Sequence, residues 1–265
     1  MAARNTYIDT QKERIIDLYL TGTSRAKIAR LYGVSDVLIA GRLQGWGVDY
    51  GRYLPVNHCA MELLNPATCY WIGYLAGDGC IEIVGDRPQR VVLLSNDLEQ
   101  LEKFKAFTSS RNKISTNKHG GHAIKIGSPT MAQRLISLGI TPRKSRTLSV
   151  TNTTLLGSID FIRGVIDSDG TISENHYKNS RSHATINITS GSKEFSQQIQ
   201  QALIKNWGAD CRIYRNRTCY NVYVISRFVI SLLVLLYATC SKSISLDRKR
   251  DKALCFIEKY GDRYE

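Results

Sequence analysis

This sequence has no Cys-x-x-Cys pair and no long apolar run, and we expect no secretion signal at its N-terminus. Its seven cysteines are an odd number, and none stands in a Cys-x-x-Cys pair. The sequence therefore disfavours both a disulfide framework and a zinc site, and it favours a reducing compartment. The N-terminal residues contain no apolar core of a secretion signal. The longest apolar run, residues 228–238, includes Ser231 and is too short to span a bilayer, so we expect no membrane partner.

Acidic residues are also scarce relative to basic ones. The 265 residues include 36 Lys and Arg against 23 Asp and Glu, a formal net charge of +13. This excess predicts a polyanionic partner, although charge alone does not separate a nucleic-acid-binding protein from a soluble basic one. The length leaves room for two or three modules with substantial cores.

What the sequence does contain is one pattern that occurs twice, at residues 71–79 (WIGYLAGDG) and 161–170 (FIRGVIDSDG). Each copy is an apolar segment of helical length that stops at an acidic residue followed by Gly. We expect this Gly to leave the helix in a left-handed conformation. Each copy also has two small residues four apart, on one face of the helix, which lets the two helices pack closely. These pairs are Gly73 with Gly77, and Gly164 with Ser168.

Such a helix pair would bring the two terminal carboxylates, Asp78 and Asp169, to one spot. Two converging carboxylates repel each other unless a positive charge lies between them, and a hard divalent cation suits that role. The structural alternative is that each Asp-Gly pair merely ends a helix. Two copies in register favour the metal interpretation.

Residues 161–170 resemble the signature of the LAGLIDADG homing endonucleases, and residues 71–79 resemble a degenerate first copy of it. The resemblance covers roughly residues 55–265. It implies that the protein binds double-stranded DNA and hydrolyses one phosphodiester on each strand with the help of metal ions. It further implies that Asp78 and Asp169 bind the catalytic Mg²⁺ or Mn²⁺, with the backbone carbonyls of Gly77 and Ser168 as further ligands.

Two departures from the signature are visible, Ala76 in place of its earlier Asp and Arg163 in place of a small residue. The earlier Asp is not a metal ligand in the family, so Ala76 leaves the implied chemistry intact. Lys144 and Lys249 occupy matching positions near the end of each half. We predict that both lysines stabilise charge on the phosphorane or order the water network. The alternative is phosphate contact or surface charge.

The predicted elements follow the same order behind both motifs: a helix, two strands, a helix, two strands and a helix. We therefore predict an α+β fold of two pseudo-twofold-related αββαββα halves, residues 55–150 and 151–265, packed through their motif helices. Strands are expected at 80–84, 90–96, 113–117, 122–126, 171–175, 184–190, 211–215 and 220–225, with a polar loop at 176–182. Helices are expected to start at Asp97 and to cover 129–138, 158–169, 193–206 and 227–238.

Residues 1–54 are predicted to form a small all-α helix-turn-helix module with a linker at 49–55. A helix over residues 7–20 precedes Ser24 and Ser35, which suit helix caps, and Gly33, which suits the turn between them. Ile39 and Leu43 would face the core. A small helical interaction domain is the alternative. The outward residues that would meet the major groove are Ser35, Asp36, Leu38 and Arg42.

In the two halves, the polar strand faces would form a saddle along the DNA. Arg and Asn on strands can read base edges, and Lys commonly contacts phosphates. For any one of these residues the alternative is a solvated sheet face. The candidate contacts are Lys113, Ser115, Asn117, Thr185, Asn187, Arg212, Tyr214, Arg215 and Arg217.

Three functions fit these features. The first is a monomeric, site-specific double-strand endonuclease of the homing type. The second is a non-cleaving transcription regulator that keeps the fold, although retention of both Asp78 and Asp169 favours cleavage. The third is a maturase that binds intron RNA, which nothing in the sequence excludes. We expect a cytoplasmic, nucleoid-associated location in a prokaryote or a phage-infected cell, or an organelle matrix.

Overall fold

The computed structural model describes residues 7–20, 23–48, 56–175, 182–225 and 228–261. The predicted linker 49–55 and all but the last residue of the predicted loop 176–182 lie outside these residues, as do Arg227, Thr21 and Gly22. In the described residues no helix combines the length and the apolar character needed to cross a membrane.

The N-terminal module contains a helical turn at residues 7–10 and the short helices α2 (Lys12–Leu20), α3 (Arg25–Tyr32) and α4 (Asp36–Gly45). The side chains of Ser24 and Ser35 cap α3 and α4 by accepting the backbone N–H groups of Lys27 and Leu38. Gly33 ends α3 at φ 65°, which a glycine adopts without strain. The module has its own hydrophobic cluster, which includes the fully buried side chains of Ile8, Ile15, Ile28, Ile39 and Leu43.

The first half consists of α5 (Pro66–Asp78), β1 (Gly79–Val84), β2 (Arg87–Ser95), α6 (Leu98–Phe107), β3 (Ile114–Thr116), β4 (His122–Gly127) and α7 (Pro129–Ser137). Its strands form an antiparallel sheet in the order β1-β2-β4-β3. Each predicted strand of this half is present, with ends that differ by a few residues.

The second half repeats this order as α9 (Ile159–Asp169), β5 (Gly170–Asn175), β6 (His183–Ser190), α10 (Lys193–Trp207), β7 (Cys211–Asn216), β8 (Cys219–Val224) and α11 (Phe228–Leu233). Its antiparallel sheet runs in the equivalent order, β5-β6-β8-β7. The predicted internal repeat and the α+β fold are confirmed.

Further short elements join and extend the two halves. These are a turn of 3₁₀ helix η1 (Lys144–Arg146), α8 (Thr153–Leu156), a π-helical segment η2 (Val234–Ala238), a second 3₁₀ turn η3 (Lys242–Ile244) and the long α12 (Asp247–Tyr260). None of them was predicted from the sequence, apart from residues 234–238, which were expected to belong to one continuous helix. Helix α12 belongs to the second half and contacts α11 and η2.

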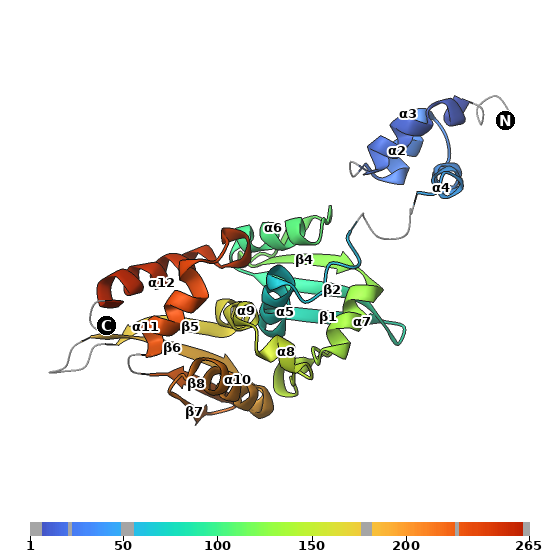
Figure 1. The fold of residues 1–265 in the computed structure, drawn as a ribbon. Coiled ribbons are helices and arrows are strands. Elements are labelled where there is room, and N and C mark those ends of the chain that lie inside the picture. Colours follow the sequence, from blue (N-terminus) through green and yellow to red (C-terminus); the bar gives the residue numbers. More distant parts are fainter. Residues whose placement is uncertain (1–6, 21–22, 49–55, 176–181, 226–227, 262–265) are drawn as a thin grey trace.

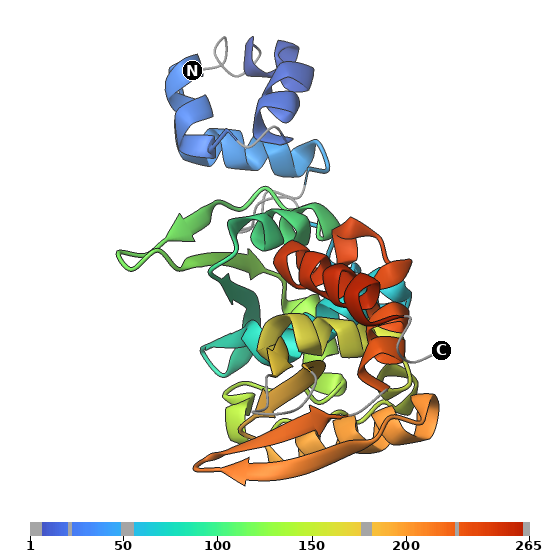
Figure 2. The ribbon, with the colours of Figure 1, turned by 90° about the vertical axis from the view of Figure 1, so that its left-hand side faces the viewer.

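The motif helices α5 and α9 pack against each other at the centre of the main body (residues 56–261), with one sheet on either side (Figures 1 and 2). The small residues lie in this crossing as predicted. A Cβ on Gly73 would meet the Phe161 carbonyl oxygen at 2.2 Å, and a Cβ on Gly164 would meet that of Tyr70 at 2.1 Å. Only glycine permits this approach.

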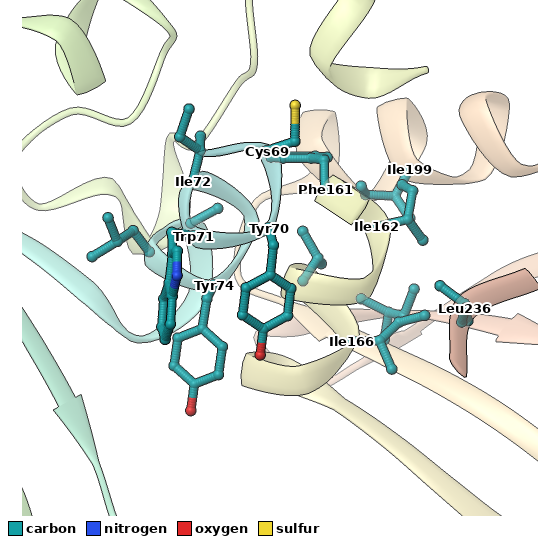
Figure 3. Close-up of a cluster of buried hydrophobic side chains, with 14 of the residues drawn as sticks. Cys69, Tyr70, Trp71, Ile72, Tyr74, Phe161, Ile162, Ile166, Ile199 and Leu236 are labelled. Carbon is teal, nitrogen blue, oxygen red and sulfur yellow. The ribbon is translucent and has the colours of Figure 1, made fainter. Parts of the chain in front are cut away.

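Large side chains of both motif helices surround the crossing and form the core. Tyr70, Trp71 and Tyr74 project from α5, while Ile162 and Ile166 project from α9 (Figure 3). The aromatic rings contact one another, Trp71 lying edge-on to Tyr70 with ring centroids 5.1 Å apart.

The glycines that follow the two motif helices differ from the prediction. Gly79 (φ −87°, ψ 154°) and Gly170 (φ −91°, ψ 161°) are extended rather than left-handed. At each glycine the chain passes directly from helix into strand. The glycine backbone lies against the last turn of the helix. A Cβ would lie 2.4 Å from the Leu75 carbonyl oxygen at Gly79 and 2.6 Å from that of Ile166 at Gly170.

Candidate functional site

Asp78 and Asp169 are the last residues of α5 and α9, and the helix crossing brings them together. The approach is close: a Cβ on Gly77 would lie 2.8 Å from Asp169 Oδ2 and 2.3 Å from Ser168 Oγ. The negative charge of Asp169 contributes to raising the pKa of Asp78. The two carboxylates therefore share one site, at the ends of the two central helices.

Burial is the main cause of the raised pKa values of both carboxyl groups. Loss of solvent raises the pKa of Asp78 to about 6, helped by the charge of Asp169 and opposed by Lys249, Lys144 and Arg248. The residues packed around Asp169 also raise its pKa, although its side chain remains open to solvent on one side. An unpaired carboxylate is costly here, and a cation would offset that cost.

Lys144 and Lys249 flank this pair, but neither is a surface charge. Both side chains are 6% exposed. Lys144 Nζ donates to the carbonyl oxygens of Gly77 (3.0 Å) and Gly79 (2.6 Å). Lys249 Nζ donates to those of Ile166 (2.6 Å), Asp167 (2.7 Å) and Gly170 (2.6 Å). The surface-charge alternative is therefore wrong.

The ammonium groups donate to backbone carbonyls in the last turn of each motif helix and in the glycine that follows it, and the Ile166 carbonyl also accepts the Gly170 N–H. Burial lowers the pKa of Lys144 and lowers that of Lys249 to about 8. The nearby carboxylates oppose the shift, Asp167 most strongly for Lys249 and Asp169 for Lys144. Both lysines thus place positive charge directly behind the Asp pair.

The donor set at this site fits a hard divalent cation. Among the described residues, no group of three or more His, Cys, Asp or Glu could hold a metal. Within the same residues, neither Asp78 nor Asp169 forms a salt bridge with a Lys, Arg or His side chain. A cation here would have two carboxylate ligands, which matches the way Mg²⁺ combines one or two carboxylates with waters and substrate phosphates. Of the two predicted carbonyl ligands, that of Gly77 already accepts Lys144 Nζ.

A third carboxylate, Asp167, lies behind the site and was not among the predicted site residues. It is 1% exposed and accepts hydrogen bonds from Tyr70 Oη (2.9 Å), Tyr237 Oη (2.7 Å) and the Leu246 backbone N–H (2.7 Å). Burial raises its pKa to about 6, against the effect of these hydrogen bonds. Leu246 is the residue before α12, so Asp167 fixes the start of the helix that carries Lys249.

The sequence offered a signal for Asp167, because it lies inside the second motif at the position that Ala76 occupies in the first. Arg163, the other departure from the signature, is buried as well. It donates to Asp160 Oδ1 (2.8 Å) and the Ile244 carbonyl (3.2 Å) and also contacts the Leu236 carbonyl. It therefore ties α9 to η2 and η3 rather than lying in the crossing of the motif helices.

Among the predicted sheet contacts in the first half, Lys113, Ser115 and Asn117 are exposed. Two of them also have structural hydrogen bonds. The Ser115 hydroxyl donates to the Ala123 carbonyl (3.2 Å), and Asn117 Oδ1 accepts the backbone N–H groups of His119 (2.8 Å) and Gly121 (3.1 Å). Asn117 therefore stabilises the turn between β3 and β4.

The second sheet separates the remaining candidates by face. Arg212 and Tyr214 pair with Tyr223 and Asn221 on the face that also carries Asn187 and Thr185. Arg212 and Tyr214 are exposed, whereas Thr185 is buried and bonded to Ser173. Arg215 alternates to the opposite face and donates to the Arg217 carbonyl in the turn. Thr185 therefore lies on this face but is buried, and Arg215 is exposed but lies on the other face.

The four outward residues predicted for the N-terminal module are also partly engaged. Arg42 pairs with Asp9 (3.0 Å) and Asp36 with Arg25 (3.5 Å). Leu38 packs against the module's cluster, and the Ser35 hydroxyl caps α4. The exposed apolar residue of α4 is Val37, which is 79% exposed. A role of this surface in DNA reading stays a prediction.

Comparisons with known proteins agree with this architecture. A family model described as a LAGLIDADG-like domain matches residues 158–232, from the start of α9 into α11. Among solved structures, the LAGLIDADG meganuclease I-AabMI bound to uncleaved DNA aligns with 76% of this chain and 93% of its own, at 14% identity and a TM-score of 0.53. Meganuclease I-SmaMI bound to an uncleaveable DNA aligns with 76% of this chain and 91% of its own, at 11% identity and a TM-score of 0.50.

Full-length DUF199/WhiA from Thermatoga maritima aligns with 78% of this chain and 72% of its own, at 13% identity and a TM-score of 0.48. A search of curated proteins found no significant match. Residues 158–232 thus contain a LAGLIDADG-like domain, and the main body has the two-half fold of single-chain LAGLIDADG proteins. The resemblance drawn from the motifs is confirmed to this extent, while the helix-turn-helix interpretation stays a prediction.

Proposed function

We propose that this protein is a site-specific DNA endonuclease of the homing type, which hydrolyses one phosphodiester on each strand with Mg²⁺ or Mn²⁺. The observation that carries the proposal is the shared site of Asp78 and Asp169, whose carboxylates have raised pKa values and no salt-bridge partner in the described residues. Asp78 is half-buried and Asp169 is exposed, and the two like charges face each other without an ion pair, in the described part of the chain, that would bind either carboxylate directly. A cation-binding role accounts for both residues.

The groups around the pair support the same chemistry. A divalent cation held by Asp78 and Asp169 would supply charge stabilisation and water activation for hydrolysis. Lys144 and Lys249 keep positive charge next to the carboxylates, where it would stabilise the extra negative charge of the phosphorane. The net charge of +13 favours a polyanionic substrate. The solved relatives of the same fold include two meganucleases bound to DNA.

The test is cleavage of a duplex that the full-length chain selects from a random-sequence library. With Mg²⁺ the wild-type protein should cut both strands. Asp78→Asn and Asp169→Asn should abolish cutting and leave the affinity within about threefold, because each removes one charge but little volume. Asp251→Asn, an exposed position on α12, is the matched control. A wild-type protein that binds this duplex tightly and never nicks it with Mg²⁺ or Mn²⁺ would instead be a non-cleaving regulator.

One observation favours that second function. The ammonium groups of Lys144 and Lys249 are engaged by backbone carbonyls, so neither lysine has its full set of donors available for a phosphate. A DNA-binding regulator needs the lysines only to hold the helix ends. The maturase alternative is distinguished by comparing affinity for intron RNA with affinity for duplex DNA. We also propose that the chain acts as a monomer, since its two halves already form a twofold arrangement.

A further inference from the structure

A cavity of about 470 Å³ opens beside Asp78 on the first-half side of the site. Asp78, Ser168, Tyr74 and the residues between β2 and α6 line one part of it, and the turn between β3 and β4 lines another. An arginine also lines the cavity, Arg248 from α12 of the second half. The second half therefore contributes a cation to the space next to the first-half carboxylate.

Arg248 is held in this position by an ion pair across the two halves. Its Nε lies 3.1 Å from both carboxylate oxygens of Asp97, the residue before α6. The neighbouring pair, Lys103 with Asp247, joins the same two helices at 2.6 Å. The Arg248 side chain nevertheless remains 60% exposed. The two contacts therefore orient the guanidinium without burying it.

The contact with Asp97 uses only part of the guanidinium. An arginine has five N–H donors in a planar fork, and Nε carries one of them. Within the described part of the chain, the terminal nitrogens of Arg248 have no hydrogen-bond partner. Four donors are therefore available at the cavity, in the geometry that suits two phosphate oxygens.

In the described residues, the Asp169 side of the site lacks an equivalent ion pair between the halves. Arg143 and Ser192 occupy the positions that correspond to Arg248 and Asp97. Ser192 has no charge, and its hydroxyl donates to the Leu148 carbonyl at 2.7 Å. The positive charges that lower the pKa of Asp169 are those of Lys144 and Lys249, whereas Arg248 joins these two lysines at Asp78. The charge next to the two carboxylates is therefore unequal.

We propose that Arg248 binds a DNA backbone phosphate on the Asp78 side of the site only, and that Asp97 is the positioning residue that holds its guanidinium there. The inference rests on the proposed function. Its consequence is that the protein cuts the two strands of the duplex at unequal rates. The Arg248 side favours one strand, and the Arg143 side offers the other strand no equivalent contact.

The test follows both strands of the selected duplex, each labelled at one end, during cleavage by the full-length protein. Arg248→Ala should change the ratio of the two strand-cleavage rates about tenfold, the effect of one charge-assisted hydrogen bond. Arg143→Ala is the matched control and should leave the ratio unchanged. Arg248→Lys, which keeps the charge and loses the fork, should give a smaller change in the same direction.

Asp97→Ala should shift the ratio in the same direction as Arg248→Ala, and the two changes together should add nothing beyond Arg248→Ala alone. Equal slowing of both strands by Arg248→Ala, or equal effects of Arg143→Ala and Arg248→Ala on the ratio, would overturn the inference while leaving the endonuclease proposal intact. Thermal melting of each variant identifies a folding defect.

A binding measurement separates failure of the inference from failure of the proposed function. Arg248→Ala should reduce the slope of log affinity against log salt concentration by about 0.9, the value that a single phosphate interaction contributes on duplex DNA. If the wild-type protein binds the duplex without cutting it, the endonuclease proposal fails, and the strand-ratio claim fails with it. The slope then decides whether Arg248 contacts a phosphate, and an unchanged slope would reject that contact.

Discussion

At the scale of single residues, a buried lysine needs hydrogen-bond acceptors around its ammonium group. Here the acceptors are the backbone carbonyls at the ends of α5 and α9. Lys144 and Lys249 thereby connect two tasks, because the same ammonium groups hold the helix ends and place positive charge beside Asp78 and Asp169. The position of each carboxylate depends on these contacts.

The carboxylate of Asp78 should reduce stability in the absence of a cation. Its pKa in the folded protein, about 6, is above the ordinary value of 3.8, so folding disfavours the charged form. This cost is absent below pH 3.8, grows as the pH rises from 3.8 to about 6 and is fully present above that value. Asp78→Asn should therefore increase the free energy of unfolding at pH 7.5, without divalent cation, by on the order of 1–3 kcal/mol.

Thermal melts across pH 4 to 8 would check this prediction, with the gain from Asp78→Asn shrinking toward the acid end. Added Mg²⁺ should stabilise the wild-type protein more than the variant, since the cation binds the carboxylate pair. Asp251→Asn, on the exposed surface of α12, should stay within about 0.5 kcal/mol throughout. A loss of stability in Asp78→Asn at pH 7.5 would contradict the prediction.

The sequence could identify the Asp pair but not the surroundings of the lysines. Asp78 and Asp169 follow from two helices that end in register, a local property of the chain. The burial of Lys144 depends instead on carbonyls 67 and 65 residues away in the chain. Lysine is rarely buried, so the sequence gives no local indication of such a contact.

At the scale of elements, the fold depends on how closely α5 and α9 approach. Gly73 and Gly164 lie where each backbone meets the other, and no side chain fits between them. The approach brings the two helix ends, and with them both carboxylates, to one site. The helix crossing is thus the mechanical basis of the candidate site.

Gly73→Ala should destabilise the main body strongly. Its Cβ would lie 2.2 Å from the Phe161 carbonyl oxygen, which belongs to the backbone of α9 and cannot move alone. Overpacking of this kind costs about 1–3 kcal/mol and occasionally more. Gly157→Ala, where the nearest atoms lie at 3.6 Å, should cost less than about 0.5 kcal/mol. Chemical denaturation of both variants measures the difference, and equal stabilities would contradict the proposed constraint.

Most elements could be predicted because their patterns are local. The alternation of Ile186 and Ile188 with polar residues identifies β6, and the segment Ser95-Asn96-Asp97 identifies the start of α6. Helix α12 was missed for a physical reason. Its buried positions, Lys249, Ala253, Phe256 and Tyr260, have helical spacing, but the first is a lysine that a hydrophobic pattern counts as exposed.

At the scale of the whole molecule, the two halves share a fold but differ in the residues around the site. The sheets have the same strand order, and both motif helices end in Asp. Within the described residues, only the second half has a carboxylate at the position of Asp167 and carries its lysine, Lys249, on a long helix, whereas Lys144 lies in a short 3₁₀ turn. A symmetric frame therefore holds an asymmetric site, which suits a duplex whose two strands differ in sequence.

The N-terminal module should act as a separate unit. Its hydrophobic cluster contains Ile8, Ile28 and Ile39 and shares no residue with the cluster of the main body. A chain of residues 56–265 should therefore melt at the temperature of the main-body transition in the full-length protein. It should bind the selected duplex more weakly, with a salt-dependence slope smaller by about 0.9 for each phosphate contact that the module makes.

Ile39→Asp in the full-length chain provides the matched control, because a charge at this fully buried position should unfold the module alone. It should reproduce the affinity and footprint of residues 56–265 while the main-body transition stays unchanged. If the shortened chain binds the duplex as tightly as the full-length protein and protects the same length of DNA, the module does not contact DNA. It would then be a helical interaction domain, and sequence recognition would belong to the two sheets alone.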